Sequence, residues 1–170
     1  MPDRRIIDDF LAQRRIAVAG VSRNPHKFGN VLFRELKQRG YDVIPLNPTL
    51  KEFDGTPCFT SLMDVPKTVD GLLIVTPPNS AVRLIQDAIA SGVRRVWLHK
   101  GAGGPGSVCS DAVRLCRENG IDVVDGACPL MFLKPSGFVH QVHRWWLQLT
   151  RELRQSSLPA GPPQIATRRK

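Results

Sequence analysis

The spacing of apolar positions changes regularly along the chain, from short, mostly apolar runs to stripes with helical spacing. The runs lie at residues 16–19, 41–46, 71–75, 93–98 and 121–124. Such runs predict the strands of a parallel sheet, because helices cover both faces of that kind of sheet. Between the runs, apolar residues recur every three or four positions, which predicts amphipathic helices. Alternating strands and helices form right-handed βαβ units, so we expect an α/β, three-layer, Rossmann-like fold with a parallel sheet.

Capping residues and glycine stop signals delimit the helices between these strands. The predicted helices cover Ile6–Gln13, the stretch from Lys27 to Gly40, Ala81–Ser91, and the stretch from Ser107, as its N-cap, to Gly120. A brief extended piece and one helical turn are expected within Cys58–Pro66.

The last fifth of the chain has a different character. A Rossmann-like domain is predicted over residues 1–135, and aromatic and aliphatic residues at helical spacing then predict an amphipathic helix over residues 136–155. We expect its apolar stripe to pack on the domain, on a second copy of the chain in a homodimer, or on a protein partner. Arginines within it also leave nucleic acid or an acidic membrane open. Residues 156–170, rich in proline and ending in basic residues, predict a disordered tail.

Composition limits the classes of protein to consider. A chain of 170 residues suffices for one domain with a sizeable core, and no apolar run approaches the ~20 residues needed to span a bilayer. Residues 1–9 do not resemble a secretory signal, and the four widely spaced cysteines indicate reduced thiols. We therefore expect a cytoplasmic protein. Its formal charge of +9 is scattered or lies in the tail, which is weak support for nucleic-acid binding.

Candidate chemistry gathers in the loop that follows the first strand. In a doubly wound sheet, ligands bind outside the carboxyl ends of the strands. Gly20 permits a sharp bend, and Ser22, Asn24 and Lys27 place donors around the turn. A helix that begins near Lys27 points its free N–H groups at the same turn, which is the arrangement that binds phosphate.

Two common nucleotide motifs are missing from the sequence. The first loop has only Gly20 of the Gly-x-Gly-x-x-Gly pattern, and the second strand ends in Leu46-Asn47-Pro48, without the acidic residue that holds the ribose of NAD. The GxxxxGK[ST] pattern of P-loop ATPases is also absent. The neutral and basic loops favour a ligand that is richer in phosphate.

Three segments carry a resemblance to a known family. They are Val18–Ser22 with Pro25 and Lys27, Val43–Pro48, and Leu62–Pro66 with Val69-Asp70. Together these segments resemble the small stand-alone CoA-binding proteins, whose Rossmann domain is similar to the CoA-binding domain of the succinyl-CoA synthetase alpha subunit. The resemblance covers residues 8–135, and it implies that coenzyme A lies across the strand ends.

The resemblance also implies roles for individual positions. Gly20, Val21, Ser22 and Lys27 would contact phosphates, Asn47 and Pro48 would flank the adenosine, Thr76, Pro77 and Ser80 would line the cleft, and Val82 would lie at the start of the following helix. Lys100, beside Gly101 in a glycine-rich loop, is a candidate second phosphate partner, with a solvated lysine as the alternative.

Two positions depart from the family pattern. Family members usually have Trp-x-Gln-x-Gly where this chain has His99 in place of the glutamine, and Ala127 stands where an arginine often precedes Cys-Pro. We expect the outer end of the site, near the pantetheine arm or acyl group, to differ most. Cys128 is a candidate for thiol–disulfide exchange with CoA, although a free cysteine is more often a small buried apolar residue.

The sequence as a whole predicts binding of CoA or an acyl-CoA by a non-catalytic sensor, carrier or partner subunit. The synthetase's phosphorylated histidine lies in a domain outside the resemblance, so CoA ligation is not implied. No metal site and no catalytic residue is predicted. The alternatives are an NAD(P)- or other nucleotide-dependent enzyme, disfavoured by the missing acidic residue, and a nucleic-acid adaptor that uses the C-terminal helix.

Overall fold

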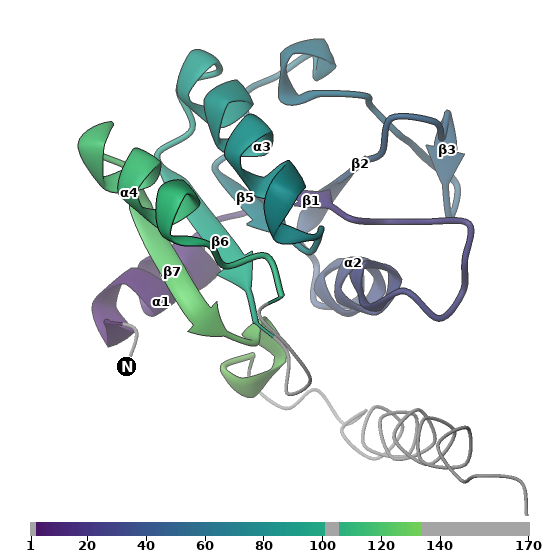
Figure 1. Ribbon diagram of the computed structural model, residues 1–170. Helices are drawn as coiled ribbons and strands as arrows, with labels where there is room; N and C mark the ends of the chain where they lie inside the picture. Colours follow the sequence, from purple (N-terminus) through teal and green to yellow (C-terminus); the bar gives the residue numbers. More distant parts are fainter. Residues whose placement is uncertain (1–2, 101–105, 134–170) are drawn as a thin grey trace, which may run out of the picture. The chain divides into compact units, whose positions relative to one another are not determined.

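The computed structural model describes residues 3–100 and 106–133 of the chain (Figure 1). The helices and the strands of the main sheet alternate as the apolar spacing predicts, except that a short hairpin and a 3-10 helix stand between the second and third of these strands. The elements are α1 (Arg4–Ala12), β1 (Arg15–Ala19), α2 (Phe28–Gln38), β2 (Asp42–Leu46), β3 (Glu52–Phe53), β4 (Thr56–Pro57), a 3-10 helix (Leu62–Asp64), β5 (Gly71–Ile74), α3 (Pro78–Ala90), β6 (Arg95–His99), α4 (Ser110–Glu118), β7 (Asp122–Ala127) and a second 3-10 helix (Pro129–Met131).

Five strands form one parallel sheet in the order β2-β1-β5-β6-β7. The chain runs from β1 outward to β2 and then returns to the other side of β1, so the order of strands reverses between β1 and β5. The strand ends are level there, because Ala19 pairs with Leu46 on one side and with Ile74 on the other. Reversal points of this kind leave a crevice at the carboxyl ends of the strands.

Two helical layers cover the sheet, each with its own buried core. On one face, Ile85 of α3 and Cys116 of α4 pack with Leu72 and Ile74. On the other, helices α1 and α2 pack on Leu73, Trp97 and other residues that alternate along the strands. The alternation follows from the side-chain period of two along a strand. The three-layer α/β fold is confirmed.

Four local details differ from the sequence predictions. Helix α3 begins at Pro78, three residues before the predicted Ala81, because proline is favourable in the first turn, where its missing N–H has no partner. Val82 therefore lies more than one turn inside α3 rather than at its start. Helix α4 begins at Ser110 with Cys109 as N-cap, so Ser107 does not cap it. The β3–β4 hairpin was not predicted, because strands of two residues carry no periodic signal.

The predicted C-terminal helix at residues 136–155, the tail at 156–170, and Gly101 lie outside the described residues. Within the described ranges, no helix has the length and apolar character that crossing a membrane requires.

Candidate ligand site at the carboxyl ends of the strands

Two glycines bring β1, β5 and α2 into direct backbone contact at the strand ends. Gly20 has a φ of 123°, and a Cβ built on it would lie 2.9 Å from the backbone carbon of Val75. A Cβ on Gly29, in the first turn of α2, would lie 2.2 Å from the carbonyl oxygen of Gly20. Only hydrogen fits at these two positions. The close approach fixes the start of α2 against the turn that leaves β1.

A buried asparagine holds the shape of this turn. Asn30 is 1% exposed, and its Oδ1 accepts a 2.8 Å hydrogen bond from the Ser22 N–H. Its Nδ2 donates to the carbonyl oxygens of Ser22 and Asn24, both at 2.9 Å. One side chain therefore satisfies three backbone groups of the turn, which would otherwise be costly to bury. Sequence reasoning missed Asn30, although a polar residue between the apolar positions of α2 was a usable signal.

The second predicted polar position connects two loops. Asn47, just after β2, donates from Nδ2 to the Val21 carbonyl at 2.7 Å, and its Oδ1 accepts from the Thr49 and Leu50 N–H groups. These bonds tie the end of β2 to the turn after β1. Pro48 beside it is exposed. In the structure Asn47 thus positions the loops, and Pro48 offers an exposed surface next to them.

The electrostatic character of the turn is positive. Arg23 and Lys27 are exposed, and among the residues that the structure describes no side chain caps the N-terminus of α2. The Asn24 side chain stabilises the turn itself, because its Oδ1 accepts from the His26 N–H at 3.0 Å. The turn thus combines an uncapped helix N-terminus with two cationic residues, and the sequence from Gly20 to Lys27 contains no carboxylate. This arrangement suits an anion such as phosphate.

The loop after β5 is fixed by a buried serine. Ser107 donates from Oγ to the carbonyl oxygens of Ile74 and Thr76, at 2.9 and 2.6 Å. The Thr76 Oγ1 is itself buried and has no hydrogen-bond partner in the described part of the chain. Pro77, as the N-cap residue of α3, and Ser80 in its first turn are exposed at the same edge. The predicted cleft residues therefore lie beside the turn after β1.

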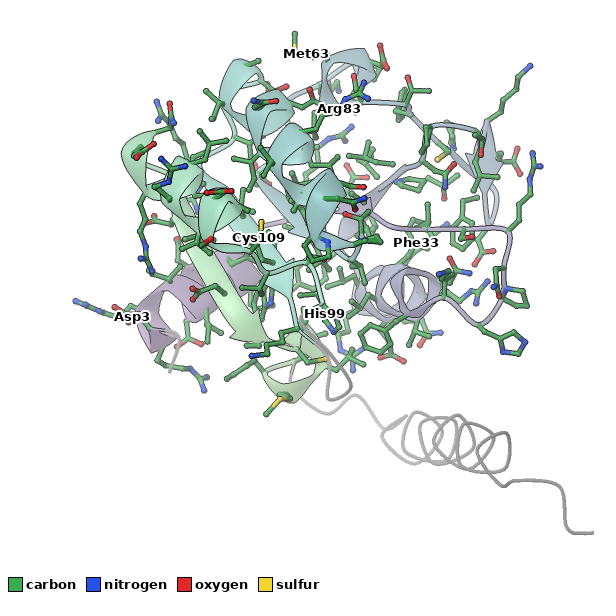
Figure 2. All side chains as sticks on the ribbon, viewed as in Figure 1. Asp3, Phe33, Met63, Arg83, His99 and Cys109 are labelled. Atoms are coloured by element: carbon green, nitrogen blue, oxygen red, sulfur yellow. The ribbon has the colours of Figure 1, made fainter. Side chains whose placement is uncertain are left out.

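The end of β6 contributes a buried histidine. His99 is 7% exposed, and its ring packs on Phe28 with centroids 4.7 Å apart. Burial lowers the pKa of His99 to about 4, so the imidazole is neutral at pH 7. Figure 2 shows His99 at the lower edge of the sheet, toward which the strands point. Lys100, the next residue, is exposed and extends the positive character of this edge.

Cysteine chemistry at the site is disfavoured by burial. Burial raises the pKa of the Cys128 thiol and raises the pKa of Cys116 to about 12. A raised thiol pKa leaves little thiolate to attack a disulfide.

We expect no mixed disulfide on Cys128 when the native protein is incubated with CoA disulfide at pH 7.5, whereas the denatured protein should be modified. Mass spectrometry of peptides measures both, and a native adduct on Cys128 would contradict the expectation.

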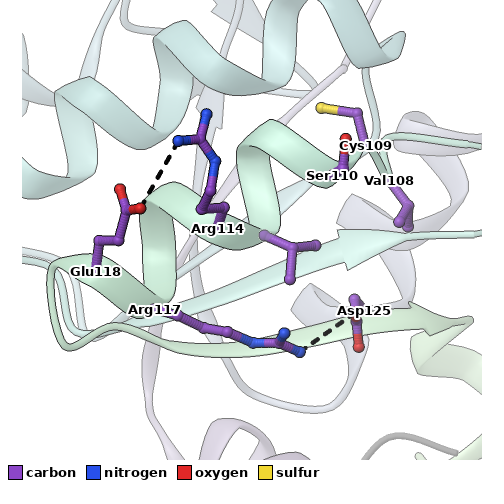
Figure 3. Close-up of a pocket in the computed structure, with 8 residues that line it drawn as sticks. Val108, Cys109, Ser110, Arg114, Arg117, Glu118 and Asp125 are labelled. Carbon is purple, nitrogen blue, oxygen red and sulfur yellow. Dashed lines mark ion pairs between the residues drawn. The ribbon is translucent and has the colours of Figure 1, made fainter.

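A hollow lies between α4 and β7 (Figure 3). It has a volume of about 400 Å³, and none of its lining residues was predicted as a site residue. Its charged side chains face each other, with Arg114 3.7 Å from Glu118 and Arg117 3.9 Å from Asp125. These side chains therefore neutralise one another within the hollow.

Within the described ranges, no group of three or more His, Cys, Asp or Glu residues could hold a metal ion.

Comparison with known proteins assigns the part of the chain that contains these loops to a protein family. The sequence model of a family described as "CoA binding domain" matches residues 14–134. The uncharacterized protein YneT of Bacillus subtilis is 23% identical over 128 residues, which are 75% of this chain and 91% of YneT. The alpha subunit of ADP-forming acetate–CoA ligase II of Pyrococcus furiosus is 33% identical over 92 residues, which are 54% of this chain but only 20% of that subunit.

Solved structures show the same arrangement of elements. A hypothetical protein from Pyrococcus horikoshii superposes with a TM-score of 0.69 at 25% identity, over 77% of this chain and 89% of that one. The dinucleotide-forming acetyl-coenzyme A synthetase 1 of Candidatus Korarchaeum cryptofilum gives a TM-score of 0.56 at 31% identity, over 64% of this chain and 25% of the synthetase. The similarity to the synthetase is therefore confined to one part of that larger enzyme.

Proposed function

The chain belongs to the family of CoA-binding domains, and from that premise we propose that it binds coenzyme A or an acyl-CoA at the carboxyl ends of β1, β2, β5 and β6. The observation that carries the proposal is the turn between β1 and α2. Within the described residues, no side chain caps the N-terminus of α2 there, and Lys27 and Arg23 are exposed. Asn30 holds the backbone of this turn by hydrogen bonds. CoA supplies the phosphates that such a turn accommodates.

Other features of the edge fit the same ligand. The loops at residues 20–27, 47–48 and 76–80 contain no aspartate or glutamate that would repel phosphate. The buried, unpartnered Thr76 Oγ1 and His99 Nε2 offer hydrogen bonds to a ligand that lies across β5 and β6, since neither has a partner among the described residues. Strand β2 ends in Leu46-Asn47-Pro48 without an acidic residue, which speaks against NAD as the ligand.

We further propose that the chain acts as a sensor, carrier or partner subunit and performs no CoA chemistry by itself. The chain spans only 20% of the ligase subunit from Pyrococcus furiosus, so most of that subunit lies outside the similarity. A partner that supplies catalytic residues would be consistent with this extent.

Thermal unfolding with CoA, acetyl-CoA, NAD, NADP and ATP tests the proposal. CoA at 100 times its Kd should stabilise the fold by about 2.7 kcal/mol, which raises the unfolding temperature by several degrees.

Lys27→Ala should weaken CoA binding about fivefold, because an exposed cation on a phosphate contributes about 1 kcal/mol.

Lys67→Ala is the matched control for this substitution. Lys67 is also exposed, but it precedes β5 and so lies toward the opposite edge of the sheet. Its replacement should leave the CoA shift unchanged. A shift with NAD or NADP and none with CoA would overturn the proposal in favour of a nicotinamide-dependent protein.

A further inference from the structure

His99 has an unmet hydrogen-bonding capacity at the ligand edge. Its side chain is 7% exposed, and its Nε2 is buried without a hydrogen-bond partner among residues 3–100 and 106–133. Buried polar atoms are nearly always paired, because an unpaired one loses its bonds to water without replacement. An isolated unpaired nitrogen in a candidate ligand site therefore indicates a partner that arrives with the ligand.

The backbone of His99 is held by two contacts, and its ring packs on one aromatic side chain. The Ser107 N–H donates to the His99 carbonyl at 2.8 Å, and a Cβ on Gly106 would lie 2.2 Å from the same oxygen. The Phe28 ring packs on the imidazole, with an angle of 35° between the two planes. Phe28 is the first residue of α2 and directly follows Lys27. The imidazole is thus held against the start of the same helix that faces the phosphate turn.

The character of the imidazole selects the part of the ligand that it can contact. Burial keeps His99 uncharged at neutral pH, so it offers one N–H donor and one lone pair but no positive charge. The charge of Lys27 and the N-terminus of α2 bind a phosphate more strongly than a neutral imidazole does. A neutral donor–acceptor group matches amides and hydroxyl groups instead.

The order of the strands separates the backbone end of β6, which carries His99, from the turn after β1, where the phosphates would bind. Strand β6 lies two positions from β1 in the sheet, so the end of β6 is ~10 Å from the end of β1 at the usual spacing of neighbouring strands. The His99 ring reaches back toward the start of α2, where it packs on Phe28, so the group that follows the ligand's phosphates is the part within its reach. In CoA, the group that continues from the diphosphate is the uncharged pantetheine arm, which contains two amides.

We propose that His99 recognises the uncharged arm of the bound CoA through a hydrogen bond between Nε2 and an amide of that arm. This inference rests on the proposed function and adds a contact that discriminates CoA from ligands that carry only its nucleotide. Phe28 acts as a positioning residue, because its ring holds the imidazole in place.

Isothermal titration calorimetry with two ligands tests the inference. CoA carries the arm, and adenosine 3′,5′-bisphosphate is its nucleotide part without the arm and without the phosphate that joins the arm to the nucleotide. His99→Phe keeps a flat ring against Phe28 but removes both nitrogens. It should weaken CoA binding about five- to tenfold and change bisphosphate binding by less than about twofold. His99→Gln, a neutral side chain with a donor and an acceptor, should retain most of the CoA affinity.

Three results would overturn the inference. CoA affinity could remain unchanged in His99→Phe, or both ligands could lose affinity equally, which would indicate a structural role alone. If the wild-type chain binds the bisphosphate as tightly as CoA, the arm makes no useful contact. Failure of the wild-type chain to bind either ligand would instead refute the proposed function, and this inference with it.

A measurement on the wild-type chain avoids any effect of substitution on folding. The imidazole ¹⁵N and ¹H NMR signals of His99, assigned with the His99→Gln variant, should shift when CoA binds. They should shift little with adenosine 3′,5′-bisphosphate. Equal shifts with both ligands would contradict a contact with the arm.

Discussion

Replacing Gly29 by alanine is expected to destabilise the protein by about 3 kcal/mol and to remove most CoA binding. In a helix, glycine to alanine is ordinarily stabilising by about 1 kcal/mol, so the local contact reverses the sign. The new methyl group would lie 2.2 Å from the Gly20 carbonyl oxygen and 2.5 Å from its carbon, both of which are backbone atoms. Either α2 or the turn must move apart, and the N–H groups of α2 then leave the phosphate position.

Urea denaturation and calorimetry with CoA measure the two effects of Gly29→Ala. Gly92→Ala is the control: Gly92 has a φ of 72°, but a Cβ there meets nothing within 4 Å. We expect it to cost about 1 kcal/mol through backbone strain alone and to leave CoA affinity unchanged. A Gly29→Ala protein as stable as the wild type would show that the backbone contact between Gly29 and Gly20 is looser than described.

Replacing Asn30 by aspartate is expected to weaken CoA binding more than tenfold and to destabilise the fold by about 2–3 kcal/mol. Aspartate can still accept from the Ser22 N–H, but it loses both bonds that Asn30 donates, to the carbonyls of Ser22 and Asn24. The carboxylate would face these two oxygens in a buried place and would repel a phosphate at the turn. The turn should then lose its shape.

Calorimetry with CoA and urea denaturation also measure the effect at Asn30. Asn119→Asp is the matched control, because the Asn119 side chain is exposed and donates one bond, to the Leu115 carbonyl at the end of α4. It should change stability by less than about 1 kcal/mol and leave CoA affinity unaltered. An Asn30→Asp protein that binds CoA normally would exclude Asn30 as the residue that shapes the turn.

Similarity to CoA-binding proteins was readable in the sequence because several short segments carry it together. Val18–Ser22, Val43–Pro48 and Leu62–Pro66 each have little weight alone, but all three lie within the match to the CoA-binding family at residues 14–134. That similarity is confirmed. The roles assigned to individual residues, such as phosphate contact by Lys27, stay predictions that the proposed experiments test.

The sequence by itself determined the α/β class and the order of the main strands and helices along the chain, and it predicts the edge of the sheet where a ligand would bind. These follow from apolar periodicity and from glycine and proline at element ends, which are local properties. It also predicts that a phosphate binds at the turn from Gly20 to Lys27.

Only the tertiary structure decided which polar side chains lie unpaired at the proposed ligand edge, within the described residues, and which support the backbone. Ser107, expected to cap a helix, instead binds the carbonyls at the end of β5, and Asn30 shapes the turn from inside α2. The His99 nitrogen that has no partner among the described residues likewise depends on how β6 packs against Phe28 of α2. Each of these contacts joins segments separated along the chain, and the direction of a buried side chain is set by that packing rather than by its neighbours in sequence.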